Sequence, residues 1–122
     1  MVDSFVERAL AAMKREPSRR WTVSSLARVA GLSRAPFARR FERATGRSPA
    51  RYLAELRLRL AATRLVTSDA RLAEIAGEIG YATEFSFAKA FKRSYGVAPG
   101  YFRKRAWAGA STIVARAVAR AA

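Results

Sequence analysis

The amino-acid sequence predicts an all-α protein of about seven helices, arranged as two helix-turn-helix subdomains that are joined by a long central helix. Two observations support this fold class. Apolar residues recur at helical spacing along nearly the whole chain, and the β-branched alternation typical of strands is missing. In addition, one half of the sequence repeats the other, which predicts two copies of one supersecondary unit.

Length and composition limit the class of protein. The 122 residues suffice for one domain or for two small lobes that share an element. With 51% hydrophobic residues the chain can bury a core, so it is not a disordered basic tail. It has 24 Lys and Arg residues against 9 Asp and Glu, and the resulting net charge of +15 favours a polyanionic partner: DNA, RNA or an anionic membrane surface.

Missing residue types and segments exclude several functions. The sequence has no cysteine and no histidine, so we expect no disulfide, no thiolate site, no metal and no cofactor. No apolar run approaches the ~20 residues that a membrane-spanning helix needs. The N-terminus lacks a charged segment followed by an apolar run, so a signal peptide is not expected. We expect a bacterial cytoplasmic protein.

Start and stop signals divide the first part of the chain into three helices. The first ends near Glu16-Pro17, and the second follows Thr22, a plausible N-cap. Gly31 ends the second helix, Ser33 can cap the third, and Gly46 ends it. The apolar residues expected to face the core of this lobe are Val6, Ala9, Leu10, Met13, Val23, Leu26, Ala27, Ala30, Phe37 and Phe41.

A long fourth helix is expected to begin at Pro49, after the cap Ser48, and to run to about Thr67. Its apolar residues form two nearly opposite sets at roughly 100° per residue. The first set is Tyr52, Leu53, Leu56 and Leu60, and the second is Leu58, Ala62 and Leu65. We interpret this segment as a central helix that different lobes cover on its two sides.

The second half predicts three more helices. The fifth carries Leu72 and Ile75 and ends at Gly80, Thr83 can cap the sixth, and a short seventh helix starts around Pro99. The apolar residues expected on the inner faces are Leu72, Ile75, Ala76, Ile79, Phe87, Ala88, Phe91 and Tyr95.

The expected divisions of the whole chain are 1–20 for the N-terminal helix of the first lobe, 21–50 for the first helix-turn-helix, 51–67 for the linker helix, 68–107 for the second helix-turn-helix with its closing helix, and 108–122 for an Ala-rich tail.

A shift of 50 residues aligns the two halves. Phe37, Ala38, Phe41, Arg43, Gly46 and Pro49 fall on Phe87, Ala88, Phe91, Arg93, Gly96 and Pro99, with Arg39 on Lys89 and Tyr52 on Phe102. Upstream the shift is 49, which places Leu26, Ala27 and Gly31 on Ile75, Ala76 and Gly80, so one extra residue lies in the second turn. A small residue, a turn glycine and two anchoring aromatic rings in each copy are typical of a helix-turn-helix.

At these residues the sequence resembles the DNA-binding domain of the AraC/XylS family of bacterial transcription regulators. The resemblance covers roughly residues 21–105. The motifs that carry it are SRAPFARRF at 33–41, TGRSP at 45–49, IA at 75–76, IGY at 79–81, FAKAFKR at 87–93 and GVAP at 96–99. It implies two homeodomain-like three-helix lobes whose recognition helices enter successive major-groove segments. A connecting helix of about twenty residues would span ~30 Å, close to the ~34 Å of one DNA turn.

The resemblance also implies partners beyond DNA. Family members commonly carry a second domain for effector sensing or dimerisation, often a cupin-like barrel on the N-terminal side. The segment before Trp21 resembles the approach to such a domain, which favours a piece of a longer regulator over a short stand-alone member. The resemblance implies an activator more often than a repressor, with RNA polymerase as the partner that it contacts.

We call the third and sixth helices the first and second readers, because each is expected to contact bases. In the first reader, the base-reading residues are expected early in the helix, opposite its apolar face. Ala35, Ala38 and Arg39 satisfy that geometry, and the family's base-contacting positions fall on the same three. Arg39 can bind guanine O6 and N7 bidentately, which is worth ~1–3 kcal/mol of discrimination; the alternative is a solvated surface arginine. The two alanines offer little beyond contact with a thymine methyl group.

The second reader is more polar and carries a large aromatic side chain. Glu84, Phe85, Ser86 and Lys89 occupy the contacting positions implied by the resemblance. Phe85 belongs to neither apolar stripe, which suits contact with a thymine methyl group; the alternative is that it fills the edge of the lobe. Glu84 can accept from cytosine N4, or it can complement the helix dipole. Lys89 is expected to contact phosphate or guanine.

Further cations supply attraction to the DNA backbone that does not depend on sequence. They are Arg34, Arg40, Arg43, Arg47, Lys92, Arg93, Arg103 and Lys104. Some arginines are expected to pair with Glu42, Glu55 or Glu78 instead. Helix N-termini at Thr22 and Ala70 can also donate backbone N–H groups to phosphate.

These residues together predict a sequence-specific double-stranded DNA-binding transcription regulator. The alternative closest to it is a non-specific, architectural DNA-binding protein, which the charge alone would fit. A membrane-surface helix would need a strongly segregated apolar face, and the tail around Arg116 and Arg120 is only weakly apolar. An enzyme is not expected, because the nine acidic residues are scattered and histidine and cysteine are missing, so no residue is assigned a catalytic role.

Overall fold

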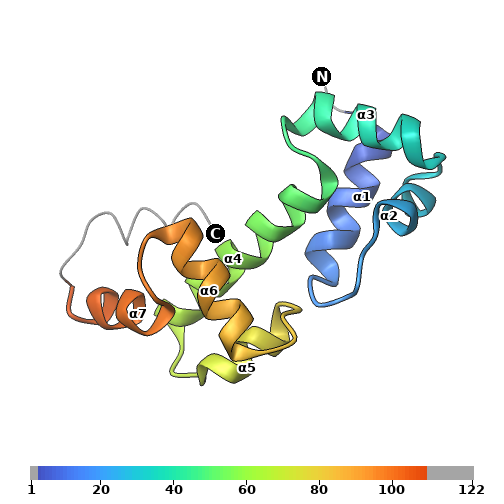
Figure 1. The fold of residues 1–122 in the computed structure, drawn as a ribbon. Coiled ribbons are helices and arrows are strands. Elements are labelled where there is room, and N and C mark those ends of the chain that lie inside the picture. Colours follow the sequence, from blue (N-terminus) through green and yellow to red (C-terminus); the bar gives the residue numbers. More distant parts are fainter. Residues whose placement is uncertain (1–2, 110–122) are drawn as a thin grey trace. The chain divides into compact units, whose positions relative to one another are not determined.

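In the computed structural model the described residues, 3–109, form seven α-helices and no strand (Figure 1). The helices are α1 (Ser4–Arg15), α2 (Val23–Ala30), α3 (Arg34–Thr45), α4 (Pro49–Thr67), α5 (Leu72–Glu78), α6 (Glu84–Tyr95) and α7 (Pro99–Trp107). The prediction of an all-α fold is confirmed. Most of the expected Ala-rich tail, residues 110–122, lies outside the described residues. Between residues 3 and 109, no helix has both the length and the apolarity that crossing a bilayer requires.

The chain divides into two compact units, and the boundary lies within α4, between Leu56 and Arg57. The first unit holds α1, α2, α3 and the start of α4. The second holds the rest of α4 with α5, α6 and α7. Each unit therefore contains one helix-turn-helix, α2–α3 or α5–α6, together with part of α4.

The first unit is built around two phenylalanines of α3. Phe37 and Phe41 are fully buried, with ring centroids 5.6 Å apart, and Tyr52 of α4 lies edge-on to Phe41 at 5.5 Å. Leu10, which the sequence pattern places on the inner face of α1, is only partly buried, and Ala12 is buried there as well. The buried apolar side chains of α1 and α2 are Val6, Ala9, Ala12, Met13, Leu26, Ala27 and Ala30.

The second unit repeats this arrangement around Phe87 and Phe91. Both rings are fully buried, their centroids lie 5.9 Å apart, and Phe102 of α7 lies edge-on to Phe91 at 5.2 Å. Tyr95 stacks parallel on Phe91 at 4.5 Å. The buried cluster is Leu58, Ala61, Ala62, Leu65, Ile75, Ala76, Ile79, Phe87, Phe91 and Phe102.

The structure confirms the repeat that the sequence shows. Tyr52 on Phe41 corresponds to Phe102 on Phe91, so α7 stands where α4 begins in the first unit. Gly31 and Gly80 both have positive φ, +86° and +94°, where a glycine is favoured because it has no side chain. Counted from the turn glycine to the start of the next helix, the first turn has three residues, 31–33, and the second has four, 80–83, so the expected extra residue lies in the second turn.

The central helix α4 begins at Pro49 and ends at Thr67, as predicted. Leu53 and Leu56 are buried in the first unit, and Leu58, Ala62 and Leu65 belong to the second cluster. The assignment of Leu60 to the first set is wrong, because it packs against the cluster of the second unit. A helix rises about 1.5 Å per residue, so Leu60 lies about 6 Å beyond Leu56 along α4, in the part of the helix that belongs to the second unit.

Two helix starts carry the predicted side-chain caps, and a third has the predicted residue but not its hydrogen bond. Thr22 accepts from Ser25 N–H at 3.0 Å, and Thr83 accepts from Ser86 N–H at 3.0 Å, each within a capping box. Ser33 is the N-cap of α3, but its side chain makes no capping hydrogen bond.

The expected helix N-terminus at Ala70 is wrong. The N–H of Ala70 donates to the Ser68 hydroxyl in the turn after α4, at 3.3 Å. Helical hydrogen bonding starts only at the Arg71 carbonyl, which accepts from Ile75 N–H at 3.0 Å. The α5 helix therefore begins at Leu72, after the N-cap Arg71.

Side chains donate the hydrogen bonds that the last carbonyl groups of α4 accept. The Ser68 hydroxyl donates to Arg64 O at 2.7 Å, Arg103 Nε donates to Leu65 O at 2.9 Å, and Trp107 Nε1 donates to Val66 O at 3.1 Å. The last carbonyls of a helix have no partner within it. Two donors from α7 therefore hold the C-terminal end of α4.

Replacing Gly96 by alanine should destabilise the protein, because Gly96 ends α6 with a φ of +82°. No atom lies within 4 Å of an added Cβ, so the expected cost is the left-handed backbone alone, about 1–2 kcal/mol.

Gly77→Ala is the matched control, since Gly77 lies inside α5 with ordinary φ and the same free space. It should stabilise by about 0.5–1 kcal/mol. Chemical denaturation of both variants measures the two changes, and a loss of stability in both would contradict the assignment.

Arg103→Ala should lower the free energy of unfolding by about 1–3 kcal/mol, because it leaves the Leu65 and Ser68 carbonyls without their donor. Lys104→Ala, one residue further on the exposed surface, should change stability by less than about 0.5 kcal/mol. Equal effects of both substitutions in urea denaturation would show that Arg103 does not hold the end of α4.

Candidate nucleic-acid interface

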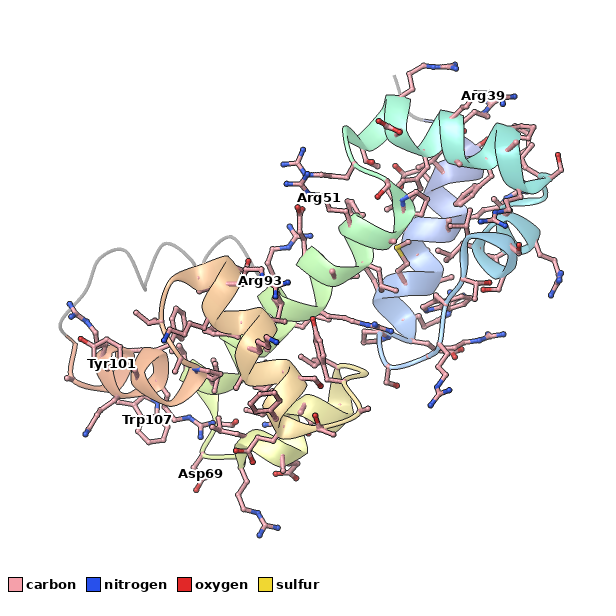
Figure 2. The ribbon with its side chains drawn as sticks, viewed as in Figure 1. Arg39, Arg51, Asp69, Arg93, Tyr101 and Trp107 are labelled. Carbon is pink, nitrogen blue, oxygen red and sulfur yellow. The ribbon has the colours of Figure 1, made fainter. Side chains whose placement is uncertain are left out.

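The inward-facing phenylalanines of α3 determine which of its residues face solvent. Phe37 and Phe41 lie one helical turn apart, so Arg34, Ala35 and Arg39 are exposed and Ala38 is partly buried. Figure 2 shows Arg39 projecting from the outer side of α3. The structure thus brings the three predicted base-reading residues of the first reader onto one side of the helix.

Arg40 is held by the start of α1. Its Nε donates to Asp3 Oδ2 at 3.0 Å, and its guanidinium lies 4.7 Å from the ring centroid of Phe5. Asp3 is also the N-cap of α1, accepting from the N–H groups of Phe5 and Val6 at 3.0 and 3.3 Å. The hydrogen bond from Arg40 holds the pKa of Asp3 below its ordinary value. The predicted phosphate contact of Arg40 thus competes with this pair.

This pair was not predicted from the sequence, although Asp3 directly before the first helix is an N-cap signal. The partner of Asp3 lies 37 residues away, which no local pattern reveals. The pair fixes the position of α3 against α1, so it bears on how the first reader is presented.

Other arginines pair with the glutamates that the sequence analysis named. Arg47 and Arg51 both bind Glu55, at 3.1 and 3.2 Å. Arg64 binds Glu78 through two hydrogen bonds of 2.9 and 2.8 Å, which hold the pKa of Glu78 below its ordinary value. The expected pairing is confirmed for Glu55 and Glu78. Arg47, a predicted phosphate contact, is therefore engaged within the first unit.

The start of α6 is held more firmly than the start of α3. Besides accepting from Thr83 N–H, the Ser86 hydroxyl donates to Thr83 O at 3.0 Å, so its first role is in the capping box. Tyr81, in the preceding turn, packs on Phe87 with centroids 5.9 Å apart, and burial raises the pKa of its phenol. These contacts fix the direction in which α6 leaves the turn.

The outer face of this first turn is exposed. Phe85 is 76% exposed, so it does not fill the edge of the lobe. Glu84 and Lys89 are exposed as well, and Ser86 is partly buried. The four predicted residues of the second reader thus lie in the first two turns of α6, which also contain the buried Phe87.

Both units also expose cations that the sequence predicts to contact phosphate. The exposed ones among the predicted phosphate contacts are Arg34, Arg43, Arg47, Lys92, Arg93 and Lys104. Figure 2 labels Arg93, which projects from α6. Arg103, also expected to face phosphate, instead donates to Leu65 O and Ser68 O and lies 5.2 Å from the Trp107 ring. In the described part of the chain its role is therefore structural.

The fold and these surfaces define a class of protein: a tandem helix-turn-helix domain whose two second helices each present an exposed first turn among cations. A family model described as a helix-turn-helix domain matches residues 26–105. The DNA-binding domain of AdpA, solved in complex with a target DNA, superposes with a TM-score of 0.80 at 30% sequence identity. That similarity covers 90% of this chain and 100% of the AdpA chain.

Two regulators of known sequence are also similar. An AraC-like transcription regulator of Streptomyces lividans is 42% identical over 104 residues, which are 85% of this chain and 34% of that protein. The transcriptional activator RclR of Escherichia coli is 44% identical over 89 residues, 73% of this chain and 31% of RclR. The chain thus spans about a third of the length of these relatives. It belongs to the AraC/XylS family and corresponds to its helix-turn-helix DNA-binding domain.

The Asp3–Arg40 pair should give the first unit a pH-dependent stability. Because the pKa of Asp3 is lowered on folding, the pair stabilises above the ordinary carboxyl pKa and loses its effect as the pH falls through the lowered value. Asp3→Asn keeps a good N-cap and removes the charge. The melting temperature of this variant should lie below that of the parent at neutral pH and converge with it in acid. A difference that persists at the lowest pH would contradict this origin.

Proposed function

We propose that this chain binds double-stranded DNA in a sequence-specific manner and inserts the first turns of α3 and α6 into the major groove, as the DNA-binding part of a transcription regulator. The observation that carries the proposal is the same in both units. The second helix of each helix-turn-helix buries two phenylalanines and exposes side chains of its first turn. In α6 the exposed side chains include Phe85, a large apolar residue that packing within the unit does not explain.

The first reader is proposed to depend on one long side chain. Arg39 is exposed on the same side of α3 as the small side chains of Ala35 and Ala38, so it is the long side chain there that can reach a base edge. Bidentate binding to guanine O6 and N7 is the contact for which an arginine is best suited. Ala35 and Ala38 would permit close approach of the helix and contact at most a thymine methyl group.

The second reader is proposed to read more base pairs. Phe85 would contact a thymine methyl group, Glu84 would accept from cytosine N4, and Lys89 would bind guanine or phosphate. The hydroxyl of Ser86 is engaged with Thr83, so we assign Ser86 to positioning the turn beside the bases. Contact of an exposed phenyl ring with a methyl group removes both from water, which favours binding.

Phosphate contacts are assigned to cations for which the described residues provide no ion pair: Arg34, Arg43, Lys92 and Arg93. Arg40 and Arg47 would have to exchange a carboxylate for a phosphate, because Asp3 and Glu55 already hold them. The N-terminus of α2, capped by Thr22, is a further candidate, since helix N–H groups attract phosphate.

The regulator of which this domain forms part is proposed to act in the bacterial cytoplasm, on the nucleoid, as an activator that contacts RNA polymerase. The relative RclR is named a transcriptional activator. The relatives are about three times as long as the matched region, which supports a further domain. The family resemblance favours an N-terminal domain for effector binding or dimerisation. No catalytic role and no cofactor are proposed.

Selection from a random duplex pool at near-physiological salt tests the proposal. It should enrich an asymmetric site with two blocks of information about 10–10.5 bp apart. Arg39→Ala should erase information in one block and Lys89→Ala in the other, at a cost of ~1–3 kcal/mol at the affected base pair. Arg15→Ala removes an exposed charge of α1 and should leave both blocks intact.

A pool without enrichment, together with an affinity that collapses as salt rises, would contradict sequence-specific reading. It would support the architectural alternative, in which phosphate contacts supply all of the binding.

Phe85→Ala should leave stability unchanged, because the side chain is largely in solvent, and should abolish one thymine preference. Replacing that thymine by deoxyuridine removes only the methyl group. The exchange should weaken binding of the parent protein about fourfold, the effect of roughly one buried methyl group, and should not affect the Phe85→Ala variant. Equal sensitivity of both proteins to deoxyuridine would show that Phe85 does not contact the methyl group.

A further inference from the structure

One face of α7 exposes two large aromatic side chains for which the DNA-reading turns give no reason. Tyr101 is 49% exposed and Trp107 is 56% exposed, and Figure 2 shows both on the outer surface of α7. Together with Gly100, Arg103 and Lys104 they line an open hollow of about 660 Å³. We call these five residues the α7 aromatic surface.

The internal repeat shows that the fold does not require this surface. The residues of α4 that match Tyr101, Arg103 and Trp107 are Arg51, Leu53 and Arg57, so the first unit has no aromatic side chain at these positions. Phe102, which does pack in the core, has the aromatic counterpart Tyr52. Core packing therefore accounts for Phe102 but not for Tyr101.

The charge of α7 also differs from the charge of the matching segment of α4. In α4 the glutamate Glu55 neutralises Arg47 and Arg51, whereas the matching residue of α7 is Arg105. Pro99–Trp107 contains no acidic residue. Among residues 3–109, no carboxylate forms an ion pair with Arg103, Lys104 or Arg105. Within the described residues, the surface and its neighbour Arg105 are therefore cationic and have no paired carboxylate.

The aromatic rings are held in place before any partner arrives. The indole of Trp107 donates to Val66 O, and the Arg103 guanidinium lies 5.2 Å from its ring. The phenol of Tyr101 accepts from Arg105 at 3.1 Å, and the same guanidinium lies 5.7 Å from its ring. Fixed side chains lose little conformational entropy on binding, which favours affinity.

The surface is also distant from the second reader. The first turn of α6 lies beside α5, while its other end leads into α7 (Figure 1). The twelve residues of α6 span about 18 Å. A partner on α7 therefore need not displace DNA from Phe85 and Lys89.

We propose that the α7 aromatic surface binds an acidic segment of a second protein. An apolar side chain of that segment would enter the hollow between Tyr101 and Trp107, and flanking carboxylates would pair with Lys104 and Arg105. Tyr, Trp and Arg are the residue types enriched where protein interfaces concentrate their binding energy. A phosphate backbone would satisfy the cations but has no apolar group for the hollow, so an acidic peptide fits the surface better than DNA does. One short helix offers a small area, so the complex should be transient.

Fluorescence of Trp107 tests the proposal in the full chain. The chain has two tryptophans, so Trp21→Phe leaves Trp107 as the only one. A short synthetic peptide in which glutamates flank a leucine and a phenylalanine should shift the Trp107 emission to shorter wavelength and saturate. The same peptide with glutamine for every glutamate should not. In the parent protein, the indole N–H resonance of Trp107 should shift with the peptide while that of Trp21 stays unchanged, which guards against an effect of the substitution.

Matched variants locate the peptide. The double variant Lys104→Glu with Arg105→Glu should weaken it roughly tenfold or more, whereas Arg15→Glu, in the other unit, should not. Tyr101→Ala should weaken it roughly tenfold, and Tyr101→Phe should largely restore binding. Circular dichroism checks that each variant keeps its helix content. The peptide should bind equally well when duplex DNA is present at saturation.

Three results would overturn the proposal. The first is a Trp107 emission that no acidic peptide changes. The second is equal binding of the glutamine peptide, which would leave no role for charge. The third is that duplex DNA alone shifts Trp107 emission and that Lys104→Glu lowers DNA affinity and its salt dependence, which would assign the surface to phosphate binding.

Discussion

Two phenylalanines, buried one helical turn apart on the second helix of each helix-turn-helix, anchor both units. Phe37 and Phe41 in α3, and Phe87 and Phe91 in α6, are fully buried. Removal of one such ring costs about 3–5 kcal/mol, a large share of the stability of a small domain. Because these rings fix the rotation of each helix about its axis, they also fix which first-turn side chains point outward.

The two readers share a backbone plan and differ in nearly every outward side chain. Arg34 and Ala35 in the first unit correspond to Glu84 and Phe85 in the second. The start of α6 has a capping box, and the start of α3 has a serine without a capping hydrogen bond. Two identical readers would prefer a DNA site made of two repeated half-sites. Two units with the same backbone and different outward side chains can instead recognise an asymmetric site. The two units therefore share their core and differ in the exposed side chains of the first turns.

Local signals in the sequence sufficed for the helices and for most of their ends, with the start of α5 as the exception. Gly31, Gly46 and Gly96 end helices with positive φ, as expected from glycine at these positions, and Thr22 and Thr83 cap as predicted. The outward orientation of Arg39 and Phe85 followed from periodicity alone. Contacts across the fold could not be predicted in this way, because they depend on which helices meet. Asp3 with Arg40, and Arg103 with Leu65, join residues 37 and 38 positions apart. The same long-range packing, not the helical period, assigns Leu60 to the second cluster.

The donors that α7 supplies to the end of α4 have a consequence for how this domain can be produced as a fragment. The match to the family model ends at residue 105, but the indole that donates to Val66 O belongs to Trp107, two residues further on. An expression fragment trimmed to the limits of the family match would leave a helix carbonyl of the second unit without its donor. The C-terminal limit of a well-behaved fragment is thus determined by a hydrogen bond to a helix that ends 40 residues earlier, at Thr67.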